Sequence, residues 1–192
     1  MACWPRVCCL VLALGGVVAS SQTPDLAPEW EVRNNMKELA SHVSRFQPIL
    51  SQVKPEAWTA AGAPDTFQSQ LKSVRNEIDY LTRSTTELSA DPERLTVALE
   101  TLFRMQFLES MLDSLSEGIR KYQNPALAEL LRGEMNQDAV YRDKLRQYIV
   151  ALASTKEFEL RVMNEEAQRC RGTLSRQAPP RQSSSNSPVL PK

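Results

Sequence analysis

The stretch LFRMQFLESMLDSL, Leu102 to Leu115, decides the fold of this chain. Wound as a helix, it places apolar side chains on well over half of its circumference. Phe103 and Phe107 lie on one side, and a larger set lies on the other. Because a helix this apolar has to be covered by other helices, we expect it to be the buried central helix of a bundle. The larger set is Leu102, Met105, Leu108, Met111, Leu112 and Leu115.

Two segments before this stretch repeat apolar residues at alternating intervals of four and three, the seam of coiled-coil-like helices. The first segment follows Pro28, and its Pro48 predicts a kink there or an early helix end near Gln47. In the second segment, Thr85 fills the one position of the seam without an apolar residue. The first seam is Val32, Met36, Leu39, Val43, Phe46, Leu50 and Val53, and the second is Phe67, Leu71, Val74, Ile78, Leu81 and Leu88.

Helix-start signals mark the connections between the segments. Asp65 and Gln68 are spaced like a capping box. Asp91-Pro92-Glu93 and Asn124-Pro125 each combine a capping side chain with a proline at the first helical position. Turns this short force neighbouring helices to run antiparallel. The longest connection, 54–63, carries Trp58, which we expect to fold onto one end of the bundle.

The last helical segment is predicted from Pro125 to about Arg171 and is too long for its neighbours. It would span about 70 Å, against roughly 37 Å for a helix of about 25 residues. Either it breaks in the polar run after Gly133, or its far end projects beyond the bundle, and both alternatives are open from the sequence. Its seam is Leu127, Leu131, Tyr141, Leu145, Tyr148, Leu152 and Val162.

Strand signals are absent from the sequence, so the predicted class is all-α. We expect an elongated antiparallel helical bundle of three to four helices with a long C-terminal helix. The bundle domain is assigned to 29–171, after a linker at 22–28. The segment 172–192 is polar, proline-rich and without an acidic residue, which is typical of a disordered tail.

Residues 1–21 have the anatomy of a secretory signal peptide. Arg6 is followed by an uncharged apolar run and then by small residues, with cleavage expected after Ala19 or Ser21. About twelve apolar residues do not cross a bilayer, which needs about 20, so we expect no membrane span after removal. The predicted location is periplasmic or extracellular. Removal of the signal leaves Cys170 as the single cysteine.

Chemical motifs are scarce. His42 is the only histidine, which excludes most metal and nucleophilic sites, and we expect it at the surface or at the edge of the core. A haem held by His42 and a methionine is the alternative, but no haem-attachment motif supports it. No cofactor or metal is therefore predicted, and no catalytic residue.

Charge adds little to the functional assignment. Basic and acidic side chains number 23 each, so no overall field favours nucleic acid, and the basic C-terminal region lacks aromatic residues to stack on bases. Glu109, Asp113 and Glu117 form an acidic ridge, because they are spaced four apart. We expect this ridge to face arginines of the last helix, namely Arg132, Arg142 or Arg146.

The leading hypothesis is an exported, non-catalytic bundle that acts through protein–protein contacts, as a scaffold, adaptor or chaperone-like clamp. The interaction surface would be the end of the last helix, and self-association there would allow an inter-chain disulfide at Cys170. The alternative is a carrier with a pocket lined by Met105, Phe107 and Met111, with His42 beside it, and an enzyme of unrecognised type is third. The predicted interaction residues are Phe158, Leu160, Val162 and Met163.

Overall fold

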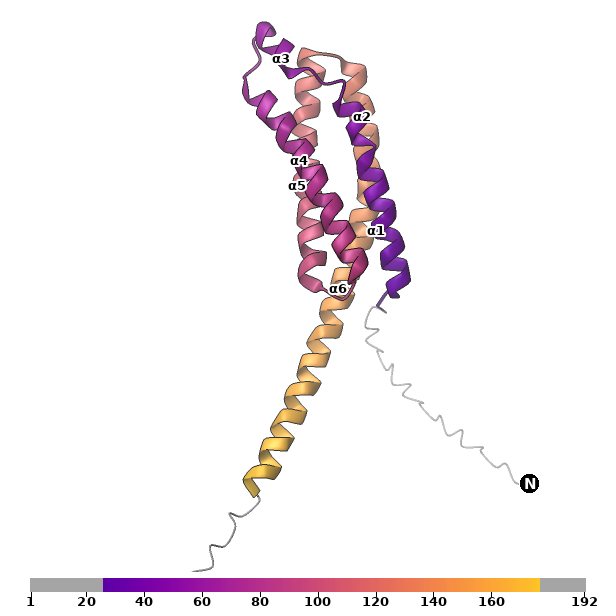
Figure 1. Ribbon diagram of the computed structural model, residues 1–192, viewed down its shortest axis with the longest axis vertical. Coiled ribbons are helices and arrows are strands. Elements are labelled where there is room, and N and C mark those ends of the chain that lie inside the picture. The colour runs from indigo at the N-terminus through magenta and orange to yellow at the C-terminus, as the bar shows by residue number, and fades with distance from the viewer. Residues whose placement is uncertain (1–25, 177–192) are drawn as a thin grey trace, which may run out of the picture.

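The computed structural model describes residues 26–176, and this part of the chain contains helices and no strand (Figure 1). The predicted signal peptide and the segment 177–192 lie outside the described residues. The prediction of an all-α antiparallel bundle with a long C-terminal helix is confirmed. In chain order the elements are α1 (Glu29–Ser44), α2 (Phe46–Leu50), α3 (Pro55–Trp58), the short 3₁₀ helix η1 (Thr59–Ala61), α4 (Thr66–Ala90), α5 (Leu95–Tyr122) and α6 (Pro125–Arg176).

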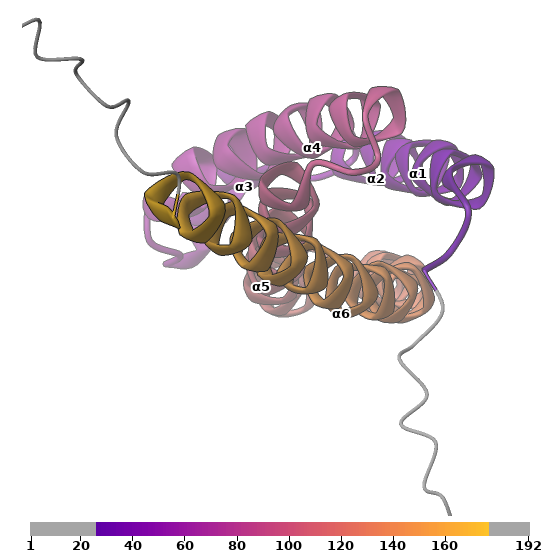
Figure 2. The same ribbon diagram turned by 90° about the horizontal axis from the view of Figure 1, so that it is seen from below.

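Helices α1, α4, α5 and α6 form the body of the bundle. Helix α5 packs against α4 and α6, and α1 packs against α4 and, with α2, against α6. Each helix therefore has two neighbours, and the arrangement closes on itself when it is viewed along the bundle (Figure 2). The apolar stripes of the helices meet in the middle.

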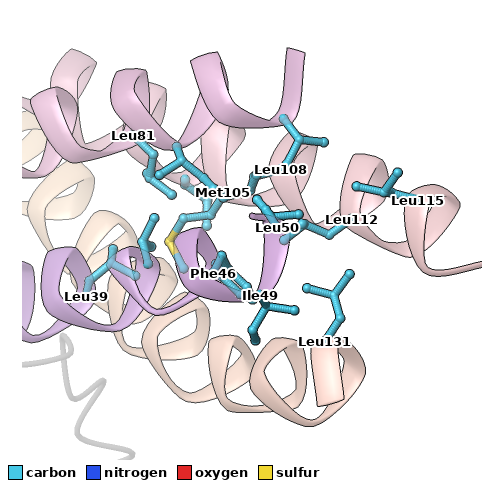
Figure 3. Close-up of a cluster of buried hydrophobic side chains, with 14 of the residues drawn as sticks. Leu39, Phe46, Ile49, Leu50, Leu81, Met105, Leu108, Leu112, Leu115 and Leu131 are labelled. Atoms are coloured by element: carbon cyan, nitrogen blue, oxygen red, sulfur yellow. The ribbon is translucent and has the colours of Figure 1, made fainter. Parts of the chain in front are cut away.

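The core is built from the predicted seams. Leu39, Phe46 and Leu50 of the first segment belong to the same core cluster as Leu108 and Leu112 of α5, and none of these side chains is more than 2% exposed (Figure 3). Thr85 is also buried, as the seam required. The broad apolar side of α5 is thus the centre of the core, in agreement with the prediction.

The opposite side of α5 departs from the prediction. Phe103 is 61% exposed and Phe107 is 56% exposed, although a fully covered helix was expected. The reason is geometric, because α5 has α4 and α6 as neighbours and no further helix in the described part of the chain covers its outer face. Helix α5 is therefore central in sequence and packing but is not enclosed.

The helix interruption predicted near Pro48 is present, but it lies at Arg45, three residues before the proline. An uninterrupted helix would need the N–H of residue 48 to bond the carbonyl of Ser44, and proline has no N–H. Helix α1 accordingly ends at Ser44, the N–H of Arg45 bonds the carbonyl of His42 at 2.9 Å, and α2 starts at Phe46.

The helix starts predicted at Asp65 and Asn124 are confirmed in position, since α4 begins at Thr66 and α6 at Pro125. Asn124 caps α6, because its Oδ1 accepts the N–H of Ala126 at 2.9 Å. The capping box is wrong, since Asp65 makes no side-chain cap on α4 and instead accepts the hydroxyl of Thr59 at 3.3 Å.

The predicted start at Asp91-Pro92-Glu93 is also wrong, because α5 begins at Leu95. The hydroxyl of Tyr148 donates to the carbonyl of Pro92 at 2.6 Å, and Lys156 binds Glu93 at 2.9 Å. These two contacts from α6 hold 91–94 as a turn.

Trp58 closes one end of the bundle, as predicted. It is 1% exposed, stacks against Tyr122 and meets Phe67 edge-on at 5.3 Å between ring centroids. Gly118 makes this packing possible, because a Cβ there would lie 2.6 Å from the ring of Phe67. The indole Nε1 donates to Gln123 Oε1 at 3.1 Å.

Helix α6 is continuous, which decides between the two sequence alternatives. It passes through Gly133 without a break and leaves the bundle near Lys156, and its far end projects beyond the other helices (Figure 1). It also continues through 172–176, which were assigned to the tail. Among residues 26–176, no helix is both long enough and apolar enough to cross a membrane.

Candidate protein interaction surface

The projecting part of α6 begins where contacts with the bundle end. Leu152 is fully buried, and Lys156 is the last residue of α6 with an ion pair to another element, at Glu93. Further along, the hydrogen bonds and ion pairs of the described residues stay within α6, for example Arg169 with Glu166 at 2.8 Å. The segment 157–176, about 30 Å long, is thus a helix without tertiary support, and we call it the projecting segment.

The predicted interaction residues lie on this segment and are exposed. The exposed fraction is 57% for Phe158, 65% for Leu160, 41% for Val162 and 67% for Met163. At about 100° per residue, Leu160 and Met163 share one side of the helix, whereas Phe158 and Val162 lie on the opposite side. The guanidinium of Arg161 lies over the Phe158 ring, 5.3 Å from its centroid. The four residues therefore belong to two separate faces.

Leu160 and Met163 belong to a longer apolar row. From Leu160 the apolar or small residues recur at intervals of three, four, three and four, which is the spacing of a coiled-coil seam. Leu174 is 62% exposed, and Cys170 is an exposed free thiol. We call this row the projecting seam, and its residues are Leu160, Met163, Ala167, Cys170 and Leu174.

The projecting seam continues the side of α6 that packs inside the bundle. Leu145, Ile149 and Leu152 are buried there, and intervals of four lead from Leu152 through Lys156 to Leu160. Two successive intervals of four shift a heptad seam sideways. The prediction that the seam runs through Val162 is therefore wrong. It continued the heptad from Leu152 without the two intervals of four residues, and for that reason it missed Ala167 and Leu174.

The acidic ridge of α5 faces α6, as predicted. Arg142 lies 2.5 Å from Glu109, and Arg132 pairs with Glu117 and lies 4.0 Å from Asp113. The hydrogen bond and charge of Glu109 raise the pKa of Arg142. These ion pairs tie α5 to α6 and serve the bundle's structure.

His42 is buried, so the prediction of a surface or boundary histidine is wrong. It is 1% exposed, and its Nε2 lies 2.7 Å from Oδ1 of Asp138 on α6. Its Nδ1 lies 3.7 Å from Glu134, and its ring stacks on Tyr141 at 5.3 Å between centroids. The sequence pattern placed His42 at the flank of one seam, but α1 has a second neighbour, α6, which covers that flank.

The His42–Asp138 pair is electrostatically unusual. Burial raises the pKa of Asp138 to about 7, and the charges of Glu109 and Glu134 act in the same direction, whereas Arg142 opposes them. Burial also lowers the pKa of His42, which the charge of Glu134 opposes. Both pKa shifts therefore favour the uncharged form of each group in the folded protein.

This pair sits at a packed interface and offers little room for chemistry. Neither ring nitrogen of His42 nor Oδ1 of Asp138 makes a hydrogen bond of good geometry within the described chain. A substrate would reach His42 only if α1 moved away from α6. Within residues 26–176, no group of three or more histidine, cysteine or acidic side chains is placed to hold a metal ion.

The side chains proposed for a carrier pocket do not converge. Met105 is 5% exposed and faces the core, whereas Phe107, 56% exposed, lies on the opposite side of α5 beside Phe103. A separate groove of about 710 Å³ lies between α1 and α6, where Val32, Met36 and Tyr148 contribute to its lining.

No protein-family model, curated protein or solved structure matches this chain.

Proposed function

We propose that this chain is an exported, non-catalytic bundle protein that acts by binding protein, through the projecting segment of α6. The observation that carries this proposal is the exposure of Leu160 and Met163, 65% and 67%, on the segment of α6 that projects beyond the bundle. A scaffold, an adaptor or a chaperone-like clamp would all use such a surface. The bundle then serves as the rigid base from which α6 projects.

Helix stability supports this role. An isolated helix of about 20 residues is marginal in water unless an apolar face is packed against something. The projecting segment has such a face, and it lacks a covering element in the described chain. Burial of a leucine or methionine side chain contributes about 1.5–3 kcal/mol. A protein partner on this face would therefore stabilise the helix and gain affinity from the same contacts.

Export is supported by the sequence of residues 1–21, with its single Arg6, apolar run and small residues before Ala19 and Ser21. N-terminal sequencing of the exported protein tests this part of the proposal. We expect the mature chain to start at Ser20 or Gln22. A mature chain that still starts at Met1 would contradict it.

Binding is tested by affinity capture from the native envelope or secreted fraction. Tagged full-length protein is compared with a double variant, Leu160→Ser and Met163→Ser, and with a chain ending at Thr155. A matched control, Phe103→Ser and Phe107→Ser, removes comparable exposed apolar area from α5. We expect the double variant and the chain that ends at Thr155 to lose capture, and the control variant to retain it. Equal capture by all of them would refute a role for the projecting segment.

A further inference from the structure

We propose that the partner of the projecting seam is a second copy of this chain, bound antiparallel so that two projecting segments form a two-helix coiled coil. This inference rests on the proposed function and names its partner. The residues of the projecting seam recur at intervals of three and four, which is the heptad spacing of a helix that pairs with another helix. In such a pair, the side chains of one seam insert between those of the other. The residues are Leu160, Met163, Ala167, Cys170 and Leu174.

The direction of the second helix follows from the side of α6 on which the seam lies. The seam continues the face of α6 that carries Leu145 and Leu152, and this face packs against α1 and α5. In a parallel pair, the earlier part of the second α6 would run through the space that α1 and α5 occupy. In an antiparallel pair, each α6 ends at the edge of the other copy's bundle and runs beside its projecting segment, which no other helix of the described chain covers (Figures 1 and 2).

The length of the projecting segment sets the register. The bundle ends at Lys156, and the last seam residue is Leu174. Placing Leu174 of one copy level with Lys156 of the other lets residues 157–173 of the two copies overlap. The two-fold axis then crosses the pair level with Glu165. Leu174 would cover the aliphatic stem of Lys156, whose ammonium is held by Glu93 at 2.9 Å.

This register produces complementary layers in the interface. Met163 of one copy lies opposite Ala167 of the other, so a large side chain meets a small one. Leu160 lies opposite Cys170, again a larger side chain against a smaller one. Both layers occur twice because of the two-fold symmetry, which is how an isologous interface is built.

The charges beside the seam agree with the same register. Glu157 of one copy lies beside Arg171 of the other, and this pair of opposite charges also occurs twice. Near the axis the two Asn164 side chains face each other, and both are able to donate and accept hydrogen bonds. The two Glu166 carboxylates also approach the axis, and each is neutralised by its own Arg169 at 2.8 Å.

The antiparallel register changes the expectation for Cys170. The two Cys170 residues lie on opposite sides of the two-fold axis, about 15 Å apart measured along the helices, which is too far for a disulfide. Cys170 instead faces Leu160 of the second copy. The inter-chain disulfide expected from the sequence therefore does not form within this dimer.

Cysteine cross-linking tests this geometry directly in the full chain. The variant Leu160→Cys, with Cys170 retained, places a thiol opposite Cys170 of the second copy. Oxidised glutathione serves as the oxidant: one thiolate attacks it and releases a glutathione, and the second thiolate attacks the mixed disulfide and releases another. We expect rapid formation of a covalent dimer in this variant. Slow or absent cross-linking is expected in the unmodified chain and in the double variant Leu160→Cys, Cys170→Ser.

A matched control is Phe158→Cys with Cys170 retained, since Phe158 lies on the opposite face of the helix. It should not cross-link. If the unmodified chain cross-links through Cys170 as rapidly as Leu160→Cys does, the pair is parallel and the inference is refuted. Equal cross-linking by Phe158→Cys and Leu160→Cys would also refute it, because random collision would then explain both.

Sedimentation equilibrium under reducing conditions supplies a second readout. The seam spans about two heptads, so we expect a reversible dimer with a dissociation constant roughly in the micromolar range. Met163→Lys should weaken it about tenfold or more. Because Met163 is 67% exposed in the single chain, circular dichroism should show an unchanged bundle. A chain that stays monomeric at all concentrations would refute the second copy as partner.

Capture experiments separate this inference from the function on which it rests. If the chain is monomeric but Leu160→Ser with Met163→Ser abolishes capture of another protein, the proposed function stands and the dimer is refuted. If the seam substitutions change neither mass nor capture, both are refuted. A monomer whose Cys170 resists maleimide labelling would show that another part of the same chain covers the seam, which refutes the dimer.

Discussion

The buried pair of His42 and Asp138 leads to a prediction in which two substitutions change the pH dependence of stability in opposite directions. In the unfolded chain Asp138 has a pKa near 3.8 and His42 near 6.5, whereas in the folded chain burial raises the first to about 7 and lowers the second. Between about pH 5 and 6.5, the folded protein therefore holds a proton on Asp138, and the unfolded chain holds one on His42.

The signs follow from proton counting. A raised carboxyl pKa contributes stability at low pH that is lost as pH rises toward 7, and a lowered histidine pKa contributes instability that grows as pH falls below 6.5. In the unmodified protein the two effects oppose each other, because one lowers and the other raises the free energy of unfolding as pH rises. Removal of either partner exposes the effect of the other.

His42→Gln leaves only the Asp138 effect, so stability relative to the unmodified protein should fall as pH rises. The size of this fall depends on how far burial lowers the pKa of His42. Asp138→Asn removes the Asp138 effect, so relative stability should rise by up to about 1.4 kcal/mol per pH unit between about pH 5 and 6.5, because the pKa of Asp138 in the folded protein is raised to about 7. Burial is the main cause of both shifts and is retained in both variants.

The assay is urea denaturation followed by far-ultraviolet circular dichroism at several pH values for the three proteins. Differences from the unmodified protein are compared, because Glu109, Glu134, Arg142 and Arg45 surround the pair in all three. Parallel pH profiles would refute the assignment of protons. A rise in the relative stability of His42→Gln with pH would refute its sign.

Two further predictions concern packing and ion pairing in the bundle. Gly118→Ala should destabilise the fold by about 1–3 kcal/mol, since its Cβ would lie 2.6 Å from Phe67. Gly133→Ala, with nothing within 4 Å, should stabilise it by up to about 1 kcal/mol. Thermal denaturation measures both, and equal effects would contradict the packing at Trp58. Arg104→Met should cost about 1–3 kcal/mol, because Glu77, 7% exposed, loses the guanidinium at 3.1 Å. Glu77→Gln should cost less in urea denaturation, and the reverse order would contradict a buried charge there.

Periodicity predicted the helices well, because alternating intervals of four and three reflect burial on one side of each helix. Even Thr85 is buried where its position in the seam required. Local start signals were weaker predictors. The cap at Asn124 formed, but at Pro92 a hydrogen bond from Tyr148, distant in sequence, held the chain as a turn. A tertiary contact of this kind leaves no local pattern.

The candidate site was predicted in part for the same reason. Leu160 and Met163 were identified from composition and length. The sequence prediction did not place them on a different face of the helix from Phe158 and Val162, because it did not include the shift of the seam at Lys156. His42 was misplaced because a single-helix pattern describes one covered side, whereas α1 lies between α4 and α6. Which flank a second neighbour covers is decided by how the helices are arranged in space.

The central claim is that the projecting segment pairs with a second copy of this chain, and hydrogen–deuterium exchange measured at increasing protein concentration tests it most directly. An uncovered helix of about 20 residues opens readily, and a partner helix slows its exchange. We expect protection of 157–176 to increase with concentration, while protection of the part of α6 that contains Leu131 and Leu145 stays constant. If protection of 157–176 is independent of concentration, association through this segment is contradicted.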